Sequence, residues 1–259
     1  MTDPLESARA KLHRADNQIR GLREQFHAGW DKHLYGISTF EDLMTGETVV
    51  TVAKPHSLFI DYSIKVGEVV HHMRSALDHA VWQMVPNPKE GVTGFPVFTL
   101  KDRDPVEPKK RYFERHGLRI IDGINPAAAT VIRNLQPFAT SKDQRLRILN
   151  DMWNWEKHRL LNMMVILPQG IAPWYRYLIE GHIRTLPFIN IPADLDDGAE
   201  IARVPHPSDF VQGEVRMEAE VAISIQFADG PAKGKSPEEF LTSLWKYAIG
   251  VIDALGKTI

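Results

Sequence analysis

The residues best equipped for chemistry lie close together, at positions 71 to 79, where the chain holds three histidines, one arginine and one aspartate. Imidazoles titrate near neutral pH, so clustered histidines can exchange protons with a substrate. Ionisable groups that pack together also shift one another's pKa values. The cluster therefore predicts a site of acid and base chemistry, in which we expect His79 to be the acid or base.

A helix over residues 62 to 85 would position these side chains. Its apolar residues fall on one side of the helix, which is typical of a helix that faces a core. The opposite side forms a polar band over residues 68 to 82, and His71 lies on it. Arg74 stands at the edge of the apolar side, four residues before Asp78, so its guanidinium can reach that carboxylate. We expect Arg74 to clamp an anion and Asp78 to be the orienting partner.

A second cluster covers residues 150 to 159. Asn150, Asn154 and His158 recur every four residues along one helical edge. They would line the same groove as the first cluster if the two helices pack together, and His158 is therefore a further site candidate. The alternative is a helix end, because Lys157, His158 and Arg159 would interact favourably with the C-terminus of a helix.

The first cluster also has a purely structural interpretation. Buried polar groups need partners, and networks of such groups are common between packed helices. In this interpretation the histidines and Asp78 satisfy one another across a buried helix contact, and Arg74 caps the network. A related hypothesis is a non-catalytic binding protein that presents the region of Trp153 and Trp155 to a partner.

The segment Arg74-Ser75-Ala76-Leu77-Asp78-His79 resembles the arginine, four residues, histidine motif of the HEPN superfamily, whose members are helical bundles and often metal-independent ribonucleases. The resemblance implies that His79 acts on a ribose 2′-hydroxyl while Arg74 steadies the phosphate. It also implies RNA or a nucleotide as partner, and a symmetric homodimer that brings two copies of the helix together.

This chain departs from the family at two points: Ser75 follows the arginine where the family often has Asn, Asp or His, and a large sheet half is added. The whole chain is also similar to a group of actinobacterial proteins that carry an RSALDH helix and a later DKHR-like segment, here residues 156 to 159. That second similarity implies no activity.

A metal-dependent enzyme is the competing hypothesis. Glu68 with His71, and Glu24 with His27, each show the spacing of three residues that helical di-iron sites use. Glu156 is a further possible carboxylate ligand. The two pairs lie on consecutive predicted helices, whereas ferritin-like sites also require helices that contribute lone carboxylates.

The composition excludes several classes of protein. The chain has no cysteine, which rules out disulfides, thiolate zinc sites and cysteine nucleophiles. It has no Walker loop, dinucleotide glycine fingerprint or nucleophile elbow, and we expect no cofactor. The start of the chain is polar and the longest apolar run is too short to span a bilayer, so we expect a cytoplasmic protein without a membrane partner.

The formal net charge of -2 gives no general attraction to phosphate. Nucleic-acid binding would therefore depend on a local basic patch. The sequence offers two candidate patches, which are Lys109, Lys110, Arg111, Arg115 and Arg119, and Arg145 with Arg147.

The order of the patterns predicts an α+β protein, with an N-terminal helical bundle and a C-terminal antiparallel sheet closed by a terminal helix. Helical spacing extends up to about residue 26 and recurs at 62 to 85, 109 to 124, 126 to 135, 141 to 161 and 236 to 255. Strands are predicted within 46 to 59 and in short segments after Asn162. We expect one domain over residues 1 to 259, mainly helical up to residue 161.

Overall fold

The computed structural model describes residues 3–30, 36–53, 56–98, 112–139, 143–166, 174–179, 182–187, 198, 200–204, 217–220 and 224–259. In these residues the chain is an α+β protein with a helical N-terminal region, as the sequence predicted. No described helix is both long and apolar enough to cross a membrane.

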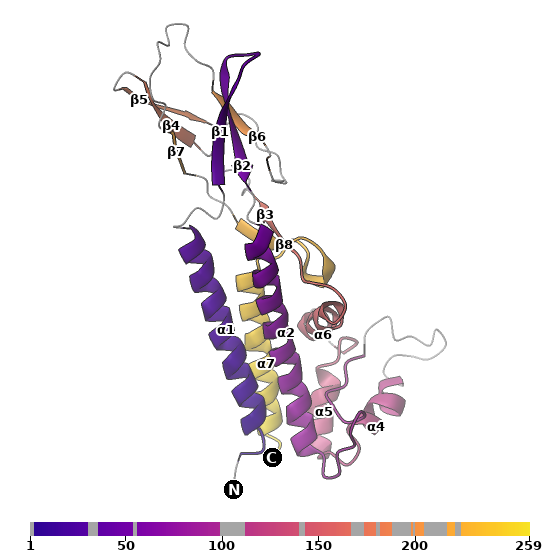
Figure 1. The fold of residues 1–259 in the computed structure, drawn as a ribbon. Helices are drawn as coiled ribbons and strands as arrows, with labels where there is room; N and C mark the ends of the chain where they lie inside the picture. The colour runs from indigo at the N-terminus through magenta and orange to yellow at the C-terminus, as the bar shows by residue number, and fades with distance from the viewer. Residues whose placement is uncertain are drawn as a thin grey trace.

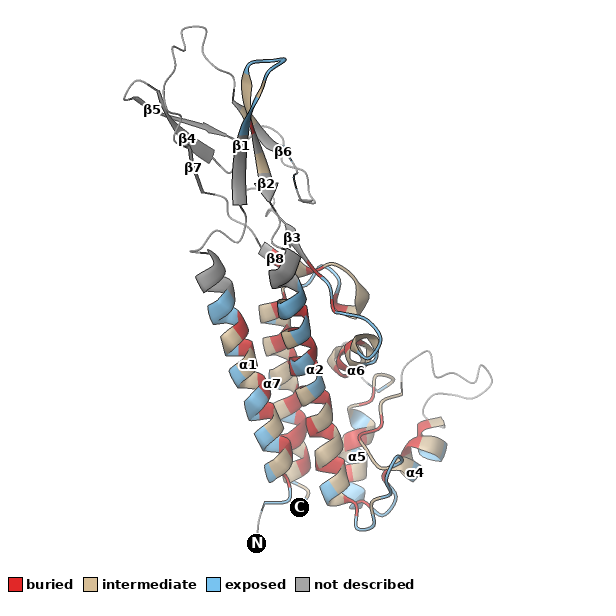
Figure 2. Ribbon diagram, in the orientation of Figure 1, coloured by how far each residue is buried: buried red, intermediate tan, exposed pale blue. Residues whose placement is uncertain are grey.

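Three long helices lie side by side in one bundle: α1 (Glu6–Trp30), α2 (His56–Met84) and α7 (Pro237–Gly256) (Figure 1). The apolar residues whose spacing predicted α1 form its buried face, which consists of Leu5, Ala8, Leu12, Ala15, Ile19 and Leu22. Figure 2 shows buried residues along the sides of the three helices that face one another. Burial of these apolar faces is the main force that holds the bundle together.

Shorter helices lie to one side of the bundle, beyond α2, and of these α6 packs against α2 (Figure 1). They are a single π-helical turn, η1 (Phe113–Gly117), and the helices α4 (Leu118–Ile120), α5 (Pro126–Asn134) and α6 (Arg145–Glu156). A buried glutamine ties this group to the segment that follows α2. Gln136 is fully buried, donates from Nε2 to the Pro96 carbonyl at 2.8 Å, and accepts a hydrogen bond from the Phe98 amide at 3.1 Å.

The strands gather at the end of the bundle where α1 ends and α2 begins (Figure 1). All pairings between the described strands are antiparallel. One sheet has the strand order β1 (Gly36–Asp42), β2 (Glu47–Ala53), β6 (Glu200–Val204). A second sheet pairs β3 (Met163–Ile166) with β8 (Ser224–Phe227). A third sheet has the order β5 (His182–Pro187), β4 (Trp174–Ile179), β7 (Met217–Glu220). The β1–β2 hairpin, which the chain inserts between two helices, thus pairs with a strand from the C-terminal half.

The structure corrects two predicted helix boundaries and adds a strand. Helix α2 begins at His56, earlier than the predicted residue 62, because neither Pro nor Gly interrupts the chain between Pro55 and that point. Helix α6 ends at Glu156 instead of residue 161, because the chain must become extended to enter β3. Strand β2 lies within the predicted segment, whereas β1 was missed. The basic residues 109 to 111 of the first candidate patch lie outside the described residues.

Candidate functional site

The side chains of the predicted site point to two different sides of α2. Arg74 and His79 are five positions apart, which separates them by about 140° around the helix axis. Arg74 faces α6 and residues 94 to 98, whereas His79 faces α1. The two residues that the family resemblance pairs in one site therefore contact different neighbours in this chain.

Arg74 is the centre of a buried polar network. Only 7% of this residue is exposed. Its Nη1 donates to Asp78 Oδ1 at 2.5 Å, its Nη2 donates to the Phe95 carbonyl at 2.8 Å, and its Nε makes a long contact of 3.5 Å with Asn150 Oδ1. The four-residue spacing to Asp78 brings the ion pair together on one helical face, as the sequence predicted. Each of the three guanidinium nitrogens thus has a partner within the protein.

Asp78 connects this network to the chain after α2. Its Oδ1 also accepts a hydrogen bond from the Phe95 amide at 2.8 Å. A Cβ atom at Gly94 would lie only 2.9 Å from the same oxygen, so the close approach of this segment requires glycine there. Arg74 and Asp78 together hold both the amide and the carbonyl of Phe95. The pair therefore anchors residues 94 and 95 to the bundle.

The aromatic ring of Trp153 covers the guanidinium of Arg74, with Cζ 5.1 Å from the ring centroid. Lys157 places its Nζ 3.1 Å from the centroid of the same ring. The pKa of Lys157 is lowered by partial burial and then by the nearby charge of Arg74. One tryptophan ring thus makes cation–π contacts with two cations.

The two clusters of the sequence meet through Asn150, because α2 and α6 pack together. His158 is exposed beyond the C-terminus of α6, where its backbone amide bonds to the Trp155 carbonyl. Among the described residues, no carboxylate forms an ion pair with Lys157, His158 or Arg159. This position agrees with the helix-end interpretation of the second cluster.

The histidines of α2 lie along its contact with α1. These helices run antiparallel: Ser7 Oγ lies 3.4 Å from His79 Nδ1, and Gln18 bonds to Glu68 Oε2 at 2.7 Å about three turns further along. The Ser7 contact leaves His79 Nε2 for an external partner. The pKa of His79 is lowered, first by partial burial and then by the positive charge of Lys11.

His72 has a similar environment two turns before His79. Its pKa is lowered by partial burial, and the charge of Lys11 is again the next cause, followed by His71 and Arg14. The Nδ1 atom of His72 is buried without a hydrogen-bond partner in the described structure. His71 is exposed, and its ring centroid lies 6.0 Å from that of His72. Because both pKa values lie below 6.5, the side chains of His72 and His79 are predominantly neutral at neutral pH.

We call this surface the α1–α2 band and define it as Lys11, Arg14, His71, His72 and His79. Sequence reasoning missed the two cations, which α1 contributes. Neither forms an ion pair with a described carboxylate. The available signal was the polar face of α1, but the register of α1 against α2 was required to match it to the histidines.

The described residues include no group of three or more His, Asp or Glu side chains that could hold a metal ion. Glu68 of the first predicted metal pair accepts its hydrogen bond from Gln18. The side chain of His27, from the second pair, lies outside the described residues.

Comparison of the chain with protein-family models, curated proteins and solved structures found no match.

Proposed function

We propose that this protein binds RNA through phosphate contacts along the α1–α2 band. The observation that carries the proposal is the pair of α1 cations beside the imidazoles. Neither Lys11 nor Arg14 forms an ion pair with a described carboxylate, and the acidic groups that act on the histidines are Glu68 beside His72 and Asp78 beside His79. Cations that have no partner within the protein attract phosphate, the dominant source of affinity in nucleic-acid binding. The resemblance of residues 74 to 79 to the HEPN motif supports the same class of partner.

The spacing of the band suits a chain of phosphates. His72 and His79 are separated by two helical turns, a rise of about 10.5 Å. At this separation the two imidazoles can contact different phosphates of one RNA strand. A neutral imidazole donates one N–H to a phosphate oxygen, and it gains a second donor where the phosphate charge favours its protonation.

The geometry supports binding more directly than cleavage. In the resemblance, the arginine steadies the phosphate on which the histidine acts. Here Arg74 has Asp78, the Phe95 carbonyl and Asn150 as partners, and faces away from His79. Lys11 is the cation that lies near His79 instead. If the chain cleaves RNA, Lys11 and His79 are the pair that the geometry favours.

Fluorescence anisotropy with a labelled single-stranded RNA tests the proposal, over a range of salt concentrations. The variant Lys11→Gln/Arg14→Gln should bind more weakly, and the slope of log K against log salt should fall by about 0.7 for each cation removed. Lys233→Gln/Lys257→Gln is the matched control, because it removes the same charge from exposed sites elsewhere. Equal losses in both variants would show that only net charge matters.

Arg74→Met separates the two interpretations of the motif. We expect this variant, once its fold is confirmed, to bind RNA as the wild type does, because the guanidinium already has partners within the protein. A specific loss of binding would return Arg74 to the role of phosphate clamp. Incubation of the same RNA in EDTA with wild type and His79→Gln would detect metal-independent cleavage.

A further inference from the structure

The tip of the β1–β2 hairpin presents two large apolar side chains to solvent. Leu43 is 90% exposed and Met44 is 94% exposed, the highest values among the large hydrophobic residues that the structure describes. Phe40, on the adjoining strand, is 55% exposed. Single exposed apolar residues are ordinary, but three within five positions at one projecting turn form a contact surface.

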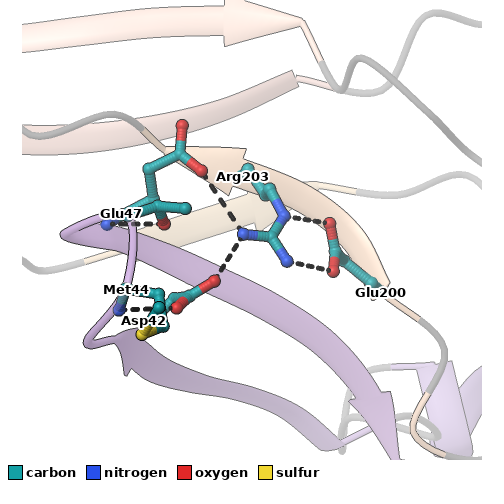
Figure 3. A network of polar contacts seen from close by, with 6 residues as sticks. Asp42, Met44, Glu47, Glu200 and Arg203 are labelled. Carbon is teal, nitrogen blue, oxygen red and sulfur yellow. Dashed lines mark hydrogen bonds and ion pairs between the residues drawn. The ribbon is translucent and has the colours of Figure 1, made fainter.

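The base of this turn is braced by Arg203 of β6 (Figure 3). Its guanidinium bonds to Asp42 Oδ2 at 2.7 Å and to both carboxylate oxygens of Glu200, and Glu47 Oε2 lies 3.4 Å away. Asp42 in turn accepts a hydrogen bond from the Met44 amide at 3.0 Å. These contacts hold the turn in one shape before any partner binds, which reduces the entropy cost of docking.

The charges around the apolar tip are mostly negative. Asp42, Glu47 and Glu200 share the single positive charge of Arg203, and Glu41 is exposed beside them. Four carboxylates against one guanidinium leave a charge of about -3 on this surface. The exposed apolar side chains of the hairpin tip are therefore surrounded by acidic residues, and we call these four carboxylates the acidic collar.

A pocket of complementary character lies beside α4. Its volume is about 620 Å³ and its apolar lining is Val92, Phe98 and Ile120. The polar lining consists of Lys89, His116, Arg119 and Asp122. Within the described part of the chain, neither Lys89 nor Arg119 forms an ion pair. The lining of the pocket thus combines apolar side chains with polar ones that are mostly basic, and Asp122 supplies its one carboxylate.

The walls of this pocket are also held in place. His116 lies in the π-helical turn η1, and such turns are rare and occur frequently at functional sites. A Cβ atom at Gly117 would lie 2.6 Å from the Phe113 ring and 2.9 Å from the Phe98 ring, so these elements are in close contact. The Phe98 amide is fixed by Gln136. The pocket is formed before a ligand arrives.

We propose that the hairpin tip of one molecule docks into this pocket of a second copy of the chain. Leu43 and Met44 would enter between the apolar side chains, and the acidic collar would meet Lys89 and Arg119. The hairpin and α4 lie toward opposite ends of the molecule (Figure 1), so the tip of one chain meets the pocket of another. A contact between two different surfaces of identical chains is heterologous and links successive copies into a ring or an open row.

This interface is small, so the association is weak and reversible, with a dissociation constant on the order of 10⁻⁴ M. Sedimentation velocity of the full chain up to about 1 mM, roughly tenfold above that constant, should show concentration-dependent growth. The tip variant Leu43→Ser/Met44→Ser and the pocket variant Lys89→Glu/Arg119→Glu should each remain monomeric. Matched controls are Ile259→Ser, which removes another exposed apolar residue, and Lys233→Glu/Lys257→Glu.

Mixing the two blocked variants gives the decisive result. The tip variant keeps a working pocket and the pocket variant keeps a working tip, so their mixture should form one-to-one dimers and nothing larger. A monomeric wild type, growth that survives in either blocked variant, or a mixture without dimers would each overturn the proposal. RNA-binding measurements do not enter this test, so the outcome is independent of the function proposed above.

Discussion

Removal of the Asp78 carboxylate should destabilise the protein more than removal of its partner Arg74. The guanidinium side chain is 8% exposed, whereas the carboxylate side chain is 32% exposed. Asp78→Ala leaves a positive charge buried and the Phe95 amide without its acceptor. Breaking a buried ion pair in this way costs about 3 to 5 kcal/mol, and the partial exposure of Asp78 places the expected loss near 3 kcal/mol.

Arg74→Met should cost less, about 2 kcal/mol, because water can reach the remaining carboxylate and methionine fills part of the space. The double variant Arg74→Met/Asp78→Ala removes both charges. Its loss should be about 3 kcal/mol instead of the additive value of about 5, which corresponds to a coupling energy of about 2 kcal/mol.

Urea unfolding of the wild type and the three variants, followed by circular dichroism, measures these values. The m-values must agree for the comparison to hold. Additivity within about 0.5 kcal/mol would refute the interpretation of this network as a coupled structural anchor. A loss from Asp78→Ala smaller than that from Arg74→Met would refute the asymmetry derived from burial.

Three further predictions concern packing and protonation. Gly117→Ala should destabilise the protein by about 1 to 3 kcal/mol, because a Cβ atom there meets two aromatic rings. The control Gly250→Ala, whose Cβ atom meets nothing within 4 Å, should stabilise the protein by up to about 1 kcal/mol. Urea unfolding compares the two variants. Burial and the charge of Lys11 lower the pKa of His79 below 6.5, so the unfolded chain binds more protons than the folded chain as the pH falls past that value, and stability is lost. The variant His79→Gln should lessen this loss of stability between pH 7.5 and 5.5. An unchanged loss would contradict the assignment. Burial, with a smaller effect of Glu238, raises the pKa of Tyr62 to about 12. Spectrophotometric titration of the wild type and of Tyr62→Phe should therefore show no difference below about pH 11. A difference near pH 10 would contradict the burial of this side chain.

Much of the helical structure could be predicted because its physical causes are local. The buried face of α1 follows from apolar residues at helical spacing. The strand β1 could not be predicted with the same ease. Its residues become a strand by pairing with β2, and that pairing depends on contacts outside the segment.

Some features of the candidate site could also be predicted from local spacing, whereas others could not. The contact of Arg74 with Asp78 follows from a spacing of four residues on one helix. The separation of Arg74 from His79 was also present in the sequence, since five residues turn a helix by about 140°. Sequence reasoning grouped the two residues because it followed a linear motif and not the angle around the axis.

What the sequence by itself determined is the order of the long helices, the face that each one buries, and the ion pair within α2, because these depend on neighbours within a few turns. The tertiary structure decided which groups from other parts of the chain lie beside those faces. Lys11 faces His79 because α1 packs against α2 in one register, and Asn150 reaches Arg74 because α6 packs on the opposite side. Such contacts depend on how several buried faces fit together, and no local pattern encodes that fit.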